Sequence, residues 1–167
     1  MVLFTHSISG AATALIFRRY PVLALIMAFL SHFVLDLIPH WHYKILSRTK
    51  DSSLPFGEKL SFGKKFLKDL ARTGLDFGMG LAVSLFVSQI FFPGNFWLTF
   101  FGACAGALPD ALQVFYYRFE SSKLLYWFQW FHEKVHAKTN LDNNPAKGIF
   151  YQIFISIAFV IAAVVLG

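Results

Sequence analysis

Long apolar segments separated by short polar breaks dominate the pattern of this chain. A run of about 20 apolar residues is long enough to cross a membrane as a helix, and a shorter run can cross when it packs against its neighbours. Prolines mark several ends of these runs, because the proline ring removes a backbone donor and disfavours helix at the residue before it. The pattern predicts five hydrophobic helices, at residues 3–17, 21–38, 73–92, 96–117 and 148–166.

Two further segments have the pattern of helices that lie in a membrane interface. Residues 58–71 place leucines and phenylalanines roughly on one side and lysines opposite, although a solvated linker would show the same charge. Residues 121–138 are dense in tryptophan, tyrosine and phenylalanine, which favour the interface. We therefore expect an all-α, polytopic transmembrane helical bundle that forms a single domain over residues 1–167.

Composition and charge narrow the class further. Hydrophobic residues make up 56% of the chain and charged residues 14%, which is unlike an ordinary soluble protein. The net charge of +6 does not indicate nucleic acid here, because eight Lys and Arg fall in the connection 39–72 and five in 118–147. Basic connections favour the cytoplasmic side. We expect a multi-pass inner-membrane protein whose partner is the lipid bilayer; its single cysteine, Cys104, excludes a cysteine-rich zinc site.

The expected topology brings all six histidines to one membrane level, on the cytoplasmic side. Ionisable groups at membrane depth are costly, so they are candidates for function. His32 and Asp36 are four residues apart and share one helix face, where they would bind a metal ion or only each other. Imidazole and carboxylate ligands indicate a divalent ion, zinc or manganese. The candidate metal ligands are His6, His32, Asp36, His40, His42, Asp110, His132 and His136.

Three carboxylates raise separate questions. Asp110, in Leu108-Pro109-Asp110, interrupts an apolar helix. It would serve either as a metal ligand or as a structural cap beside a proline kink. Glu133 lies in the sequence His-Glu-Lys-Val-His at 132–136, which is the H-E-x-x-H pattern of zinc metalloproteases with the Glu as general base. Asp76 lies near the start of a predicted helix, where the dipole alone would favour it. Glu133 and Asp76 are the candidate catalytic residues.

Three short segments resemble the YdjM/YbcI-type family of inner-membrane metal-dependent hydrolases. Residues 31–36 resemble its S-H-x-x-x-D segment, residues 5–7 its T-H-S segment and residues 108–110 its L-P-D segment. The resemblance implies metal-binding roles for four side chains: His6, His32, Asp36 and Asp110.

The chain also departs from that family. Leu112 stands where a second aspartate is expected, and no H-R-G precedes Thr5. The L-P-D segment follows the S-H-x-x-x-D segment instead of preceding it, as in a circular permutation. The H-x-x-x-D…H pattern is similar, more loosely, to zinc-dependent phospholipase C and P1-type nucleases, which suggests phosphoester chemistry by analogy.

Three functions are consistent with the sequence. The first is a membrane-embedded metal-dependent hydrolase with a cytoplasm-facing site, acting on a lipid-like phosphoester. The second is an intramembrane zinc metalloprotease that uses residues 132–136, with Asp36 or Asp110 as third ligand. The third is a non-enzymatic scaffold, or a transporter linked to protons or metal ions.

Overall fold

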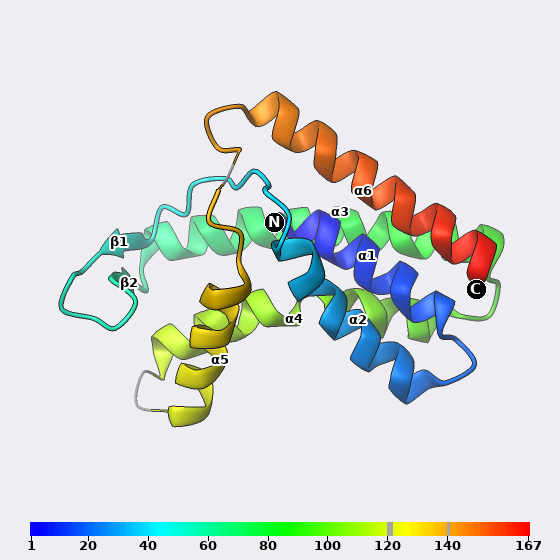
Figure 1. The fold of residues 1–167 in the computed structure, drawn as a ribbon, viewed down its shortest axis with the longest axis horizontal. Helices are drawn as coiled ribbons and strands as arrows, with labels where there is room; N and C mark the ends of the chain where they lie inside the picture. Colours follow the sequence, from blue (N-terminus) through cyan, green and yellow to red (C-terminus); the bar gives the residue numbers. More distant parts are fainter. Residues whose placement is uncertain (120–121, 140) are drawn as a thin grey trace.

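The computed structural model describes residues 1–119, 122–139 and 141–167, and within them the chain is mostly helical (Figure 1). A short antiparallel hairpin is the exception, with Arg48 opposite Leu60 and Lys50 opposite Glu58. The elements in order are α1 (Leu3–Ile16), α2 (Pro21–Asp36), β1 (Arg48–Lys50), β2 (Glu58–Leu60), α3 (Lys64–Phe91), α4 (Phe96–Arg118), α5 (Lys123–Val135) and α6 (Pro145–Leu166).

Three of the described helices, α3, α4 and α6, are long and apolar enough to cross a membrane. The helices α1 and α2 are also apolar but have 14 and 16 residues. They rise about 21 and 24 Å, against a hydrocarbon core of about 30 Å. The prediction of an all-α chain with membrane-spanning helices is confirmed in this coarse form, and five spans remain a prediction.

Helix α1 forms the centre of the bundle, and α2, α3, α4 and α6 all pack against it (Figure 1). Every residue of α1 from Thr5 to Leu15 is buried. Close approach depends on glycine: a Cβ atom added at Gly10 would collide with the backbone of Gly102 and Gly106 in α4. Small residues at a helix crossing let the backbones come together where lipid gives no hydrophobic drive between helices.

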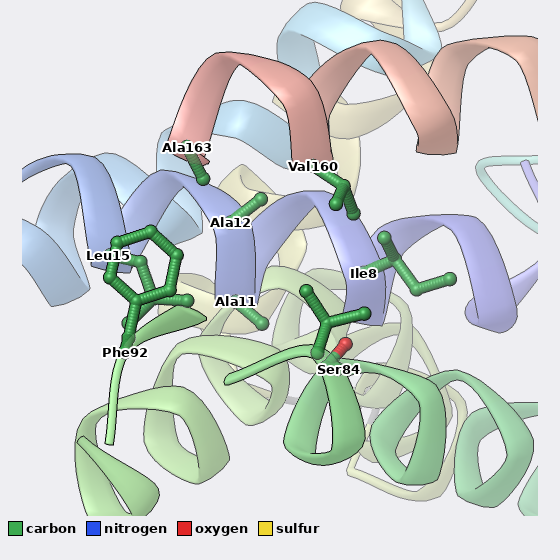
Figure 2. A pocket seen from close by; sticks show the side chains of 9 residues that line it. Ile8, Ala11, Ala12, Leu15, Ser84, Phe92, Val160 and Ala163 are labelled. Atoms are coloured by element: carbon green, nitrogen blue, oxygen red, sulfur yellow. The ribbon is translucent and has the colours of Figure 1, made fainter. Parts of the chain in front are cut away.

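A small apolar cavity lies between α1, α3 and α6 (Figure 2). Ile8 and Ala12 of α1, Ser84 of α3 and Val160 of α6 line it, and the Ser84 hydroxyl donates to the carbonyl of Gly80 at 2.8 Å. None of its nine lining residues is ionisable. The cavity is therefore a packing feature of the bundle, and the chemistry lies elsewhere.

One predicted element is wrong. Residues 58–71 do not form a separate interfacial helix: Glu58–Leu60 is a strand, and Lys64–Phe91 is one continuous helix. No proline interrupts residues 64–91, so the helical hydrogen bonds continue from the basic segment into the apolar one. Gly57, with a φ of 67°, permits the turn that closes the hairpin.

The predicted segment 121–138 does contain a helix, α5, and Ser121 lies outside the described residues. Its exposed surface includes Leu124 and Trp127, which are 79% and 61% exposed. Ser122 caps its first turn by accepting from the Leu125 amide. This surface suits a membrane interface, and that placement remains a prediction.

Asp69 of α3 anchors the connection between α2 and the hairpin. Its carboxylate accepts from the Leu46 amide at 3.0 Å and from the Ser47 amide and hydroxyl, both at 2.7 Å. The side chain is almost fully buried, so Asp69→Ala leaves these donors without their acceptor. We expect a loss of about 2 kcal/mol in unfolding free energy, measured by thermal denaturation in detergent.

The matched control is Asp51→Ala. Asp51 also accepts from a serine amide and hydroxyl, those of Ser53, but its side chain is exposed. Water replaces such bonds, so we expect the melting temperature of Asp51→Ala to stay close to that of the wild type. Equal losses in the two variants would show that burial at Asp69 is not the cause.

Candidate metal centre

Four side chains from three helices converge near the C-terminal end of α2. His32 and Asp36 come from α2, Asp110 from α4 and His132 from α5, and we call this group the four-ligand site. One ligand atom of each lies within 4.8 Å of those of the others. The i,i+4 spacing on α2 puts His32 Nε2 3.1 Å from Asp36 Oδ2.

The distances match those around a tetrahedral ion. Ligand atoms about 2.1 Å from such an ion lie about 3.4 Å apart. His132 Nε2 is 3.1 Å from His32 Nε2 and 3.3 Å from Asp36 Oδ2. Asp110 Oδ1 is 3.7 Å from each of the two Nε2 atoms. Asp36 Oδ2 is buried and makes no hydrogen bond of good geometry, so it points into the group rather than at one partner.

Neighbouring groups orient these ligands. His32 Nδ1 lies 2.8 Å from the carbonyl oxygen of Gly106, which only accepts, so Nδ1 carries the hydrogen. A neutral His32 then presents its lone pair at Nε2, toward the other ligand atoms. Gln113 Nε2 donates to Asp110 Oδ1 at 3.0 Å and holds that oxygen in place. Such outer partners are typical of metal sites.

His6 extends the four-ligand site from α1. Its ring stacks on His32 with centroids 3.8 Å apart, and its Nε2 lies 3.3 Å from Asp36 Oδ1. The side chain is fully buried, and neither ring nitrogen makes a hydrogen bond of good geometry. A buried imidazole without such a bond is costly, and a metal ion at one nitrogen would remove that cost.

Three more histidines converge beside this group. His40, His42 and His136, the histidine triad, have ligand nitrogens within 4.8 Å of one another. The Nε2 atoms of His40 and His42 are 2.8 Å apart, and those of His42 and His136 are 3.3 Å apart. Burial, then the Met1 ammonium, lowers the pKa of His40 to about 3, and the same causes lower the pKa of His42 to about 4. Both imidazoles are therefore neutral near pH 7, as ligands must be.

Asp36 lies between the two groups. Its Oδ2 faces the four-ligand site, while its Oδ1 is 3.7 Å from His40 Nε2. The Met1 ammonium is 3.0 Å from Asp36 Oδ1 and 2.6 Å from His40 Nε2.

Comparisons with protein families, characterised proteins and solved structures give no match to this chain.

The structure places all eight predicted metal ligands in or beside these two groups. The two predicted catalytic carboxylates belong to neither. Asp76 accepts from the Phe4 amide at 3.1 Å and from the Tyr43 hydroxyl at 3.4 Å, so it anchors the start of α1. Glu133 is exposed and accepts from Gln129 Nε2 at 3.0 Å.

The sequence pattern at 132–136 does not have the geometry of an H-E-x-x-H zinc site. Helix α5 ends at Val135, and His136 has extended backbone angles, φ −60° and ψ 134°. Its imidazole joins the histidine triad, whereas His132 joins the four-ligand site. The two histidines thus do not face one ion from one helix surface.

Sequence reasoning missed three groups that orient the ligands: Gln113, the Gly106 carbonyl and Asp142. Gln113 follows Asp110 by three residues, a spacing that puts both on one helix face and would have flagged it. Asp142 accepts from the His42 amide at 2.9 Å and lies 3.4 Å from His42 Nδ1. Asp142 and His42 are 100 positions apart, and no sequence signal links them. No sequence signal marks the Gly106 carbonyl either.

Proposed function

We propose that this chain is a membrane-embedded metal-dependent hydrolase whose four-ligand site binds the catalytic ion. The observation that carries the proposal is the convergence of two imidazole nitrogens and two carboxylate oxygens at tetrahedral spacing. Two carboxylates balance the charge of a divalent ion, and a mixed nitrogen and oxygen set suits zinc or manganese.

Access to the site supports catalysis over a purely structural role. The side chains of His32, Asp36 and His132 are at most 4% exposed, whereas Asp110 is 27% exposed. The site is therefore closed on the bundle side and reachable past Asp110. Four protein ligands fill a tetrahedral shell, so hydrolysis would require the ion to take water as a fifth ligand, an expansion that catalytic zinc sites can make.

Each residue of the four-ligand site and its neighbours has a separate role in the proposed hydrolysis. A divalent ion held by His32, Asp36, Asp110 and His132 would lower the pKa of a bound water and polarise a phosphoryl oxygen. His32 is held by the Gly106 carbonyl with its Nε2 lone pair aimed inward, and Gln113 holds Asp110. The apolar packing of α1 and α2 around His6 and Asp36 excludes water from the inner side.

A lipid-like phosphoester is the substrate class we infer. The site lies beside α5, whose exposed leucine and aromatic surface suits the head-group region. The first turns of α3 are basic, with Lys64, Lys65, Lys68 and Arg72. They come before Asp76 in the same helix, and Asp76 contacts α1 near the site. Basic residues at this end favour a cytoplasmic position at an inner membrane and would attract anionic head groups.

Elemental analysis of detergent-purified protein tests this proposal. We expect zinc or manganese bound at the four-ligand site of the wild type, one equivalent fewer in His32→Ala, and the wild-type content in Asp51→Asn, which changes an exposed carboxylate. Metal-loaded protein is then expected to hydrolyse bis(p-nitrophenyl) phosphate or a phospholipid. Metal lost in His32→Ala without hydrolysis of any phosphoester would instead favour the scaffold or transporter.

Glu133→Gln separates the hydrolase from the metalloprotease. In the structure Glu133 pairs with Gln129 and belongs to neither group of ligand atoms, so we expect this variant to keep its metal and its phosphoester hydrolysis. The metalloprotease requires Glu133 as general base. Peptide cleavage by the wild type that disappears in Glu133→Gln would overturn the proposal.

A further inference from the structure

The histidine triad lies apart from the four-ligand site and has its own ligand atoms. His40 and His42 follow α2 in a connection without regular secondary structure, and their ring centroids lie 4.3 Å apart. His136 comes directly after the last residue of α5, Val135. We propose that His40, His42 and His136 form a second metal site, which binds a zinc-class divalent ion through three imidazole nitrogens.

The outer nitrogens of the triad support this proposal. His40 Nδ1 lies 2.6 Å from the carbonyl of Ile38, and His136 Nδ1 lies 3.2 Å from the carbonyl of Ala137. Carbonyl oxygens only accept, so both Nδ1 atoms carry hydrogen, and in a neutral ring of this tautomer Nε2 carries a lone pair. His42 Nδ1 faces the carboxylate of Asp142 at 3.4 Å.

Lone pairs that face one another repel, unless a cation lies between them. The Nε2 atoms of His40, His42 and His136 converge at 2.8 and 3.3 Å. Each ring is thus arranged as in a metal-ligating histidine, with one nitrogen on an oxygen and the other aimed at a common point. The Met1 ammonium lies 2.6 Å from His40 Nε2, and a metal ion at the common point would separate the lone pairs of His42 and His136.

Backbone hydrogen bonds hold the two halves of the triad together. The Ala137 amide donates to the carbonyl of Asp36 at 2.7 Å, and the Leu141 amide donates to the carbonyl of His40 at 3.0 Å. These bonds fasten the segment after α5 to the segment after α2. His136 is therefore positioned opposite His40 and His42 by the main chain, without help from an ion.

The ligand chemistry defines the kind of ion. Three imidazoles without a carboxylate suit zinc, copper or nickel and do not suit magnesium or calcium, which take oxygen ligands. Only His40 of the triad is buried, whereas three of the four side chains of the other site are buried, so we expect the ion at the triad to exchange faster. The inference stands on its own ligands and does not require that the four-ligand site hydrolyse a substrate.

A zinc titration of the metal-stripped, detergent-solubilised protein tests the second site. We expect two equivalents of Zn²⁺ for the wild type by calorimetry and elemental analysis. His42→Gln and His136→Gln should each lose one equivalent and keep the other, and His32→Ala should lose the other one. Circular dichroism and thermal denaturation verify that each variant is folded.

The outcomes separate this inference from the proposed function. Two results would overturn the second site. One is that both folded triad variants bind two equivalents of Zn²⁺. The other is that the wild type binds one equivalent and both variants keep it. Loss of both equivalents in His136→Gln would show one joint cluster and would overturn two distinct sites. A single wild-type equivalent lost in His136→Gln but kept in His32→Ala supports the triad and contradicts the four-ligand site.

Asp142→Ala provides a finer test. Asp142 contacts His42 but offers no atom to the converging group, so it acts by positioning the ring. Loss of such an outer partner weakens metal binding about 10–100-fold. We expect that loss at the triad with no change in Zn²⁺ affinity at the four-ligand site. Unchanged affinity at both sites would contradict the arrangement of His42.

Discussion

Asp36→Ala is expected to remove the metal ion from the four-ligand site and to abolish hydrolysis. Asp36 Oδ2 lies within 3.3 Å of both His32 Nε2 and His132 Nε2, and its other oxygen is 3.3 Å from His6 Nε2. Loss of an outer partner alone costs about 10–100-fold in metal affinity, so loss of this central ligand should exceed about 100-fold. Competition with a chelator of known zinc affinity measures the change.

Asp36→Asn serves as the companion variant, because it keeps the shape of the side chain and removes its charge. It should fold as the wild type does and still bind metal poorly, since a neutral amide is a weak ligand for zinc. Asp51→Asn, an exposed carboxylate, is the control. Full metal content in a folded Asp36→Asn variant would contradict the four-ligand site.

Gly106→Val is expected to cause the largest loss of stability, about 3 kcal/mol. A Cβ atom at Gly106 would collide with the carbonyl oxygen of His6 and the Cα of Gly10. Backbone atoms of a packed helix cannot move aside as a flexible side chain does, so α1 and α4 must separate. Thermal denaturation in detergent measures the effect.

The same substitution should also weaken metal binding. The Gly106 carbonyl orients His32 through Nδ1, so displacement of α4 releases that ring. Gly78→Val is the matched control: Gly78 lies in α3 with nothing near its absent Cβ, and valine is no worse than glycine in a helix. A similar melting temperature for the two valine variants would show that α1 and α4 do not pack through Gly106.

Much of the fold could be predicted from local sequence. Apolar runs bounded by Pro21 and Pro39 and by the turn at residues 92–95 predicted four helices to within a few residues of α1, α2, α4 and α6. These predictions depend on length, hydropathy and helix-breaking residues, which act over a few neighbours. The predicted helix 73–92 lies almost entirely within α3, but its continuation back to Lys64 was missed. A change from basic to apolar residues changes the surroundings of a helix and does not end it.

The hairpin had a local signal that hydropathy concealed. Asp51, Pro55 and Gly57 form a cluster of turn residues between the two strands, and Gly57 has the positive φ that such a turn requires. The strands have only three residues each, which is too short to show an alternation of apolar and polar side chains.

The sequence by itself determined which residue types are available for a metal site and that they lie near helix ends. His32 and Asp36 share a face because the helix repeat requires it. Only the tertiary structure decided the grouping. It assigned His132 and His136, four residues apart, to different groups, because α5 ends between them at Val135. It also joined Asp36 to Asp110 and His132, because glycines let α1 and α4 approach closely, and the ends of α2 and α5 then meet the interior of α4.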